Sequence, residues 1–239
     1  MNAPTKRVRL DENVLGKNEK EKEKAMRKEE EVKHEECEDI DESEAGTTPM
    51  TLMEAIYKRA SVRDFTSQMV EKNIIDSLLE TAVRAPTALG EECWSFVVIQ
   101  DKSLLKRVSD VSKAEWIKEP EEELLRRGLL QAWIDSMKTV GYDLLHDAGT
   151  LLLICAPTDT DWGADDCWLA AQNIMLAATS IGLGTCVMGS AVKGCNTSEM
   201  KSNLGIPQHM AVVVPIIVGY PAGEVTPTER RAPSVVWKC

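Results

Sequence analysis

The stretch Ala164–Gly184, ADDCWLAAQNIMLAATSIGLG, decides the fold of this chain of 239 residues. From Ala164 to Ile181 it is almost wholly apolar, which is typical of a helix that is buried on every side. In a chain of this size, such a helix lies either in the middle of the fold or in a subunit interface. Gly182-Leu183-Gly184 then ends the helix, because glycine readily adopts the backbone conformation that closes many helices.

Further helices are predicted on both sides of this stretch. Thr51-Leu52-Met53-Glu54 has the form of a capping box, in which the threonine oxygen accepts from the Glu54 amide and the carboxylate reaches back. It predicts a helix that runs to about Arg59. Apolar residues at helical spacing predict a second helix over 70–84, closed by Pro86. The other predicted helical segments are the charge-rich residues 102–145, broken at Pro120, and residues 197–204.

Four apolar runs are predicted as strands. Residues 95–100 and 150–156 have the composition of buried strands, 185–188 a short strand and 210–219 a long one. Pro215 inside the last run predicts an edge position or a bulge, because proline has no amide hydrogen to donate to a neighbouring strand. This order of elements predicts an α+β fold of three layers, with helices around a mixed sheet.

The N-terminal residues differ from the rest in composition. Residues 1–50 carry 10 Lys/Arg against 15 Asp/Glu and almost no large apolar side chains, so we expect a disordered charged tail over 1–49 and an ordered domain over 50–239. The net charge of −11 divides into −5 in residues 1–50 and −6 (18 basic against 24 acidic) in residues 51–239. This balance predicts no nucleic-acid partner and no anionic-membrane partner. Without an apolar run of about 20 residues or a signal-peptide core, we expect a cytoplasmic protein.

The cysteines and histidines give little support to a metal site or a nucleophile. Seven cysteines form no CxxC pair, and we expect most of them to be buried or incidental free thiols. Cys93 and Cys195 fall in predicted loops and are candidates for reactive thiols. Three histidines, none of them paired at ligand spacing, favour neither a metal site nor a Cys-His dyad.

The most specific candidate for ligand binding is the basic run Lys58-Arg59-Ala60-Ser61-Val62-Arg63, directly after the first predicted helix. In an extended segment, alternate residues point the same way, so Arg59, Ser61 and Arg63 form a converging set of donors for an anion such as phosphate. The alternative is a helix end with basic residues that complement the helix dipole.

Three later segments add weaker signals. The loop Arg84–Trp94 is rich in small residues that let a planar ligand approach the backbone, although it is also compatible with an ordinary connection. The glycines of Gly182–Ser190 follow a helix, so they indicate a helix cap and a second backbone platform and not a dinucleotide loop. Gly219-Tyr220-Pro221 leads to the basic pair of Glu229–Pro233, for which solvated charge is the alternative.

In order and spacing, these segments together resemble the nitroreductase family of flavoproteins over residues 51–237. The family pattern is R-x-S-x-R, then A-P-S/T, an apolar helix that ends in G-L-G, then G-Y-P and a terminal R-x-P. It is met here by Arg59/Ser61/Arg63, Ala85-Pro86-Thr87, Gly182-Leu183-Gly184, Gly219-Tyr220-Pro221 and Arg231-Ala232-Pro233.

The resemblance implies a three-layer α-β-α fold with a mainly antiparallel sheet, in a domain-swapped homodimer with one FMN in each of two interface clefts. Arg59, Ser61 and Arg231 would hold the phosphate and ribityl chain, and Arg63 would reach the pyrimidine edge of the ring. Pro86, Thr87 and Ala88 would line the ring from the partner subunit. The backbone of Met188, Gly189 and Ser190 would face N5, and the set of cofactor-binding residues also includes Ala60 and Gly90.

The resemblance further implies that NADH or NADPH delivers hydride to FMN and that a nitroaromatic, a quinone or a similar small acceptor takes the electrons. No catalytic side chain and no metal are then required, because the cofactor carries the chemistry. The chain departs from the family pattern at Gly90-Glu91-Glu92-Cys93, where many members carry amide side chains and a proline. Glu92 places an acid near the substrate opening. Glu229 stands where some members have a second phosphate-binding cation, for which Arg230 is a substitute.

Two alternatives remain open. A reductive dehalogenase of the iodotyrosine deiodinase type also has an acid before the tryptophan, as in Glu92-Cys93-Trp94, but residues 104–145 show no clear Glu/Tyr/Lys set for an amino-acid zwitterion. The second alternative is a flavin-binding redox sensor in which the charged tail contacts a partner.

Overall fold

The computed structural model describes residues 50–238. The segment 1–49, expected to be a disordered tail, lies outside the described residues. Four strands form one sheet in the order β1-β2-β4-β3, with every neighbouring pair antiparallel. They are β1 (Ser95–Ile99), β2 (Thr150–Pro157), β3 (Gly184–Val187) and β4 (Met210–Gly219).

Two expectations about the sheet need correction. The sheet is antiparallel and not mixed, and parallel pairing within residues 50–238 is confined to one isolated bridge, between Ser61 and Thr185. Strand β1 is an edge strand in which only Ile99 is fully buried, so it is less buried than its apolar composition predicts. Strands β2 and β4 lie in the centre and are buried almost throughout.

Pro215 lies in a central strand and not at an edge, but the strand does carry a bulge. Ile154 pairs with Val214 and Cys155 with Val212, so Val213 is the extra residue. The Pro215 carbonyl accepts from the Met188 amide at 2.8 Å, and both backbone groups of a strand residue face the same neighbour. Pro215 therefore lacks an amide on the side that faces β3, at a point just beyond the last β3 residue, Val187. The hydrogen bonds between β2 and β4 are on the other side and are not affected.

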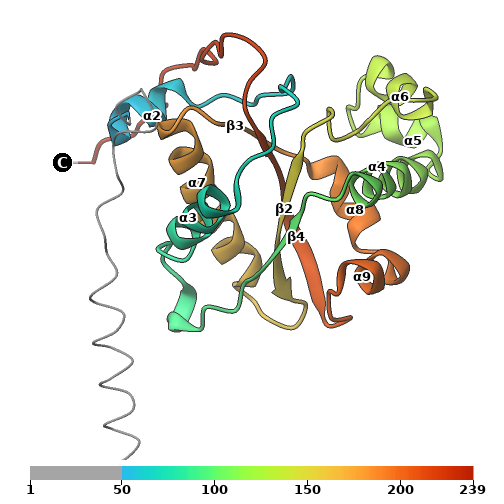
Figure 1. Cartoon of the computed structure of the whole chain (residues 1–239), viewed down its shortest axis with the longest axis horizontal. Helices are drawn as coiled ribbons and strands as arrows, with labels where there is room; N and C mark the ends of the chain where they lie inside the picture. Colours follow the sequence, from blue (N-terminus) through green and yellow to red (C-terminus); the bar gives the residue numbers. More distant parts are fainter. Residues whose placement is uncertain (1–49, 239) are drawn as a thin grey trace, which may run out of the picture. The chain divides into compact units, whose positions relative to one another are not determined.

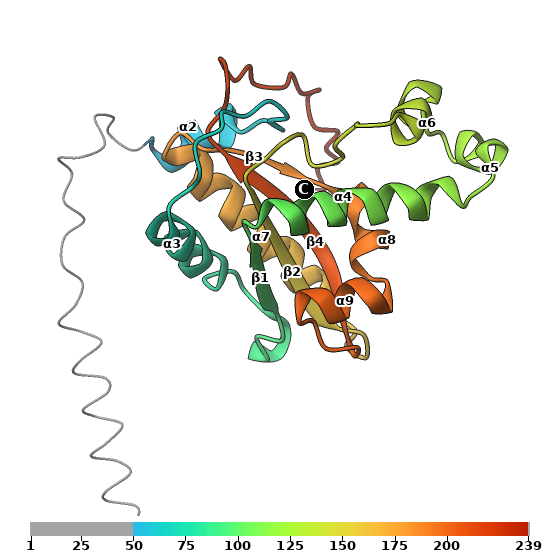
Figure 2. The ribbon, with the colours of Figure 1, turned by 45° about the vertical axis from the view of Figure 1, so that its right-hand side comes forward.

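Helices cover both faces of the sheet, which confirms the three-layer α-β-α fold (Figures 1 and 2). One face is covered by α2 (Leu52–Lys58), α3 (Lys72–Ala82) and α7 (Gly163–Ser180), and the other by α4 (Lys102–Ile117), α8 (Val192–Cys195) and α9 (Ser198–Leu204). Strand β2 supplies both cores, with Leu151, Leu153 and Cys155 in the α4 core and Leu152, Ile154 and Ala156 in the α7 core. Alternation along a strand explains this division.

The segment after α4 forms a small helical lobe beside the sheet. Pro120 breaks the helix as expected and begins α5 (Glu121–Arg126), which is followed by α6 (Gln131–Lys138). A separate apolar cluster of Trp116, Leu124 and Ile134, with Trp133 packed against it, holds the lobe together.

Helix α7 is buried only on its inner side within one chain. Ala170, Ala171, Ile174 and Ala178 have no exposed surface, whereas Trp168 and Leu169 are 49% and 44% exposed. The single chain therefore leaves uncovered the outer side of a helix whose composition predicts burial all round.

Candidate functional site

The basic run 59–63 follows α2 and lies along β3. Both hydrogen bonds of the capping box are present, and α2 ends at Lys58 with Arg59 as its C-cap. The Val62 amide donates to the Thr185 carbonyl at 3.0 Å, which extends the sheet locally at its β3 edge. Farther on, the Thr66 amide donates to Tyr220 at 2.8 Å, so the segment is held between β3 and the chain that follows β4.

Two glycines of the sequence pattern provide the space for this segment. Gly184 and Gly219 lie opposite each other in the β3-β4 pair. A Cβ atom at Gly184 would lie 2.8 Å from the Val62 side chain, and one at Gly219 would lie 2.8 Å from Phe65. Such distances are below normal carbon contact, so both positions require glycine. Gly182, at φ +83°, has the left-handed backbone of the helix cap expected there.

The cations of the run are available for a ligand. Arg59 is half-buried, Arg63 and Ser61 are exposed, and Ala60 is buried beneath them. Among residues 50–238, no acidic side chain lies within ion-pairing distance of Arg59 or Arg63, whereas Arg107, Arg126 and Arg127 each pair with a glutamate. Uncompensated cations next to a hydroxyl group favour an anion as the ligand.

Arg63 lies beside the loop that joins α6 to β2. Burial, and then the positive charge of Arg63, lower the pKa of His146 in this loop. His146 also has a left-handed backbone with φ 57°. The loop is held by α4, because Lys113 Nζ donates to the Tyr142 carbonyl at 2.5 Å and the Leu144 amide donates to Ser109 Oγ at 2.8 Å.

The backbone platform Met188–Ser190 lies beyond the end of β3 and is held by α4 as well. Trp116 Nε1 donates to the Ser190 carbonyl at 2.7 Å, and the Met188 amide donates to Pro215. Gly189 is exposed, and a Cβ atom there would meet nothing within 4 Å. The platform is therefore open on the side where a planar ligand would approach the backbone.

The role of α4 as a common support was missed by the sequence analysis. A signal was present: Ser109, Ser112 and Lys113 fall on the buried face of a charge-rich helix, and all three are buried. Buried polar side chains in a helix need partners, so they indicate contacts to other segments.

The loop with Pro86, Thr87, Ala88 and Gly90 is docked on the first turn of α7. The Ala88 amide donates to Asp166 Oδ1 at 3.1 Å, and Asp166 is 3% exposed. Leu89, Gly90 and Glu92 in this loop have a positive φ. Side-chain-bearing residues rarely adopt this conformation, and it often marks a functional loop. Pro86 and Glu92 are exposed, and Thr87 is half-buried.

One protomer does not bring this loop to the basic run. Asp166 and Ser180 are 14 residues apart along α7, which corresponds to about 20 Å at 1.5 Å per residue. Asp166 holds the loop, whereas the Ser180 carbonyl accepts from the Met50 amide just before α2. Figures 1 and 2 show α2 and the α3–β1 connection at opposite ends of the sheet.

Arg231 lies in the segment that follows β4. Residues 222–238 are all exposed and contain no helix or strand, and no hydrogen bond or ion pair of Arg231 is present in the described part of the chain. Of the predicted site residues, the chain thus brings together Arg59, Ala60, Ser61 and Arg63 beside β3, with Met188, Gly189 and Ser190 beyond the end of that strand.

Among the residues that the structure describes, four of the five cysteines are buried, as expected. Cys195 lies in α8 and is fully buried, so the expectation that it is in a loop and reactive is wrong. Burial raises the pKa of Cys195 and of Cys167 to about 12, and that of Cys155 to about 11. Cys93 is half-buried in the loop before β1. No cluster of three or more potential metal ligands occurs within residues 50–238, and no helix there is long and apolar enough to cross a membrane.

The comparisons with known proteins define the class. The model of the nitroreductase family matches residues 56–220, from within α2 to the residue after β4. The match covers more than half of the chain, and the chain belongs to the nitroreductase family.

Individual relatives are distant. A curated protein of Archaeoglobus fulgidus, named putative NADH dehydrogenase/NAD(P)H nitroreductase, is 26% identical over 177 residues, which are 72% of this chain and 86% of that one. An iodotyrosine deiodinase of Thermotoga neapolitana is 25% identical over 174 residues, 71% of this chain and 88% of that one. The solved structure of a nitroreductase with bound FMN from Bacteroides fragilis covers 79% of this chain and 98% of its own, with TM-score 0.69 and 22% identity. The last likeness shows the shared fold.

Proposed function

We propose that this chain is an FMN-dependent oxidoreductase that takes hydride from NADH or NADPH and passes the electrons to a nitroaromatic, a quinone or a similar small acceptor. One observation carries the proposal. Arg59 and Arg63, without acidic partners in the described chain, flank Ser61 on an extended segment beside β3, and the open backbone platform 188–190 follows the same strand. The names of the nitroreductase relatives and the membership of the family support the same activity.

The residues present fit an FMN molecule. Arg59 and Ser61 would bind the phosphate, and Arg63 would place a fixed positive charge at the pyrimidine edge, where negative charge accumulates on the ring. The platform Met188–Ser190 would position the ring through backbone groups, aligned by the bond from Trp116 to Ser190. The bound flavin supplies the hydride and electron chemistry, so the side chains bind, orient and tune charge.

We also propose a homodimer in which each site is completed by the second chain. The loop Pro86–Gly90 lies about 20 Å along α7 from the basic run, so the partner's copy of this loop would line the ring. The outer side of α7 supports this arrangement, because Trp168 and Leu169 are exposed apolar residues on a helix that needs burial. A domain-swapped C-terminal segment would carry Arg231 to the partner, with exposed Val236 and Trp237 available for packing.

A direct test uses the purified full chain. We expect it to be yellow with the absorption of an oxidised flavin, and to oxidise NADH or NADPH when a nitroaromatic is added. Arg59→Ala should lose mainly FMN affinity, whereas Arg63→Ala should also lower the rate per bound flavin. Arg126→Ala, which removes an exposed arginine in the lobe, is the matched control. A colourless protein that binds no added FMN would contradict the proposal, and equal rates per flavin in both variants would contradict the division of roles.

The nature of the acceptor separates this proposal from its nearest alternative. A deiodinase should consume mono-iodotyrosine under dithionite, and an amino-acid substrate needs a free cation for its carboxylate. Lys113, which contacts the loop before β2, is already bonded to the Tyr142 carbonyl and to Asp110, which favours the nitroaromatic or quinone acceptor. Efficient mono-iodotyrosine turnover would reverse this choice.

We propose that residues 50–239 form the catalytic domain, in the cytoplasm, and that residues 1–49 are not needed for turnover. Deletion of residues 1–49 should then leave the rate with a nitroaromatic unchanged. A redox sensor that depends on the tail would instead lose a binding partner on this deletion. Fractionation of cells with an antibody to the chain tests the location.

A further inference from the structure

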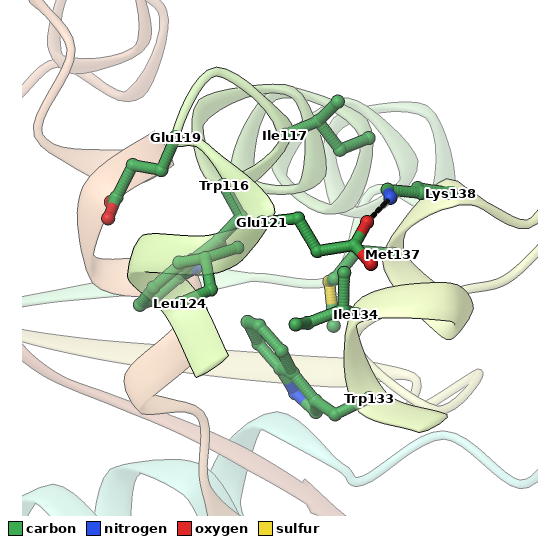
Figure 3. A pocket seen from close by; sticks show the side chains of 9 residues that line it. All are labelled: Trp116, Ile117, Glu119, Glu121, Leu124, Trp133, Ile134, Met137 and Lys138. Carbon is green, nitrogen blue, oxygen red and sulfur yellow. Dashed lines mark hydrogen bonds and ion pairs between the residues drawn. The ribbon is translucent and has the colours of Figure 1, made fainter. Parts of the chain in front are cut away.

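The helical lobe contains a cavity of about 170 Å³ between the end of α4, α5 and α6 (Figure 3). Its walls are mainly apolar and include the rings of Trp116 and Trp133 and the side chains of Leu124, Ile134 and Met137, with three charged residues in addition. Leu124, Ile134 and Met137 are at most 4% exposed, so the cavity is lined by side chains fixed in the interior of the lobe. Ile117 also lines the cavity and is 47% exposed, so the cavity opens to solvent on that side.

The two tryptophans give the cavity aromatic walls. Their ring centroids are 5.0 Å apart, and the rings are perpendicular with an interplanar angle of 89°. Lys193 Nζ lies 3.8 Å and Arg127 Cζ 5.6 Å from the centroid of the Trp116 ring. Both tryptophans also line the cavity, so a third aromatic ring bound there would gain buried area and ring contacts. Apolar cavities of about 150 Å³ are known to hold benzene, so the volume here suits one substituted ring.

The charged groups of the lining are already paired. Glu121 pairs with Lys138 across the cavity, as Figure 3 shows, and also accepts from Gln131 at 2.9 Å. Glu119 pairs with Arg127 at 2.6 Å and also with Lys193. A charged ligand would lose its hydration in the cavity and would find no free side chain of opposite charge there. The cavity therefore favours an uncharged ligand.

We propose that this cavity is a binding site for a small uncharged molecule with a single aromatic ring. It is separate from the candidate flavin site, because Trp116 stands between them. The Trp116 side chain lines the cavity, and its indole nitrogen donates to the Ser190 carbonyl of the backbone platform. The inference rests on the lobe alone and does not require the proposed FMN chemistry.

The test measures binding of 4-fluorotoluene to the full chain by fluorine NMR, with and without added FMN. We expect binding in both samples with similar affinity, because a saturated flavin site leaves the lobe cavity free. The anion 4-fluorobenzoate should bind at least ~tenfold more weakly, which corresponds to the cost of removing a charge from water.

Two matched tryptophan variants locate the probe. Ile117 lines the cavity and is 47% exposed, so Ile117→Trp can extend into the cavity without disturbing a buried position. Leu125 lies on α5, is 42% exposed and is not among the lining residues. Ile117→Trp should weaken 4-fluorotoluene binding by roughly tenfold or more, and Leu125→Trp should change it by less than about twofold.

Three results would overturn the proposal. The first is no binding of 4-fluorotoluene at its solubility limit, which would mean a packing void only. The second is equal weakening by both variants, which would place the probe elsewhere. The third is loss of probe binding when FMN is added, which would place it in the flavin cleft. A chain that binds no FMN but binds the probe as described would contradict the proposed function and leave this inference standing.

Discussion

The two ends of α7 hold the two halves of the candidate site by different physical means. At the C-terminal end, the segment 59–66 is fixed by backbone hydrogen bonds to β3 and to Tyr220, and it packs on glycines that leave room for Val62 and Phe65. At the N-terminal end, the loop 86–92 is anchored by one bond to the buried Asp166 carboxylate and contains residues with a positive φ.

The two halves should therefore tolerate different substitutions. The segment 59–66 packs on glycines that have no side chain, so its position is sensitive to any carbon atom added at those glycines. The loop 86–92 is held by the Asp166 carboxylate as its acceptor, so its position is sensitive to the removal of that carboxylate. Because α7 separates the two segments within one chain, binding of one FMN by both of them should depend on the contact between two chains.

The largest effect is expected for Leu169→Arg, which places a charge on the uncovered side of α7. If this side forms the dimer contact, burial of an unpaired charge should convert the protein to a monomer and lower FMN affinity by roughly 100-fold or more. Light scattering and flavin titration measure the two effects. Leu130→Arg changes an exposed leucine in the lobe and serves as the control. A Leu169→Arg monomer that binds FMN normally would show that one chain completes the site.

The next effect is expected for Gly184→Ala, at the C-terminal end. The added carbon would lie 2.8 Å from Val62, which sits between Ser61 and Arg63, so the basic run must shift. We expect a loss of about 1–3 kcal/mol of unfolding free energy, as for other overpacked sites, together with weaker FMN binding. Gly223→Ala, with nothing within 4 Å of the new carbon, should have little effect. Chemical denaturation compares the two variants, and equal stability would show that the basic run does not pack tightly on Gly184.

The sequence predicted the C-terminal half better than the N-terminal half for a physical reason. A capping box, a cluster of arginines and glycines at fixed intervals are local signals, and the structure places Arg59, Ser61 and Gly184 next to one another. The bond from Asp166 to Ala88 joins residues 78 positions apart, and no local pattern reports it.

The features of the fold that the sequence did not predict also depend on long-range contacts. The strand positions were predicted because apolar runs are local, but the exposure of β1 and the central place of Pro215 follow from the strand order. That order is a property of long-range pairing. The supporting role of Trp116 and Lys113 depends in the same way on contacts between α4 and segments distant in the sequence.

A moderate effect is expected for Asp166→Ala, at the N-terminal end. Loss of the carboxylate leaves the Ala88 amide without its acceptor, and a hydrogen bond to a charged group contributes about 1.5–3 kcal/mol. Part of this loss should be recovered by water, because the loop is partly exposed. Asp165→Ala, in the same helical turn but exposed, is the control. Hydrogen exchange of the Ala88 amide should become faster in the first variant only, and an unchanged rate would show that the loop is held by other contacts.

A smaller effect at the same end is expected from alkali. Cys167 follows Asp166, and burial raises its pKa from 9.0 to about 12. As the pH rises above 9.0, the thiol ionises in the unfolded chain before it ionises in the folded one, so unfolding becomes more favourable. Stability should therefore be fully present below pH 9 and should fall progressively above it. Cys167→Ala should make this fall shallower in denaturation curves between pH 8 and pH 10, and an unchanged slope would assign the fall to other groups.

The smallest effect is expected from acid, at the C-terminal end. The pKa of His146 lies below its ordinary value of 6.5, because burial and the nearby charge of Arg63 disfavour the protonated ring. As the pH falls through 6.5, the unfolded chain therefore binds a proton before the folded chain does, and stability decreases. His146→Asn is a suitable variant, because asparagine tolerates the left-handed backbone at φ 57°. It should flatten stability between pH 7 and pH 5, while the alkaline fall assigned to Cys167 persists. A variant whose stability still falls equally between pH 7 and pH 5 would assign the acid loss to other groups.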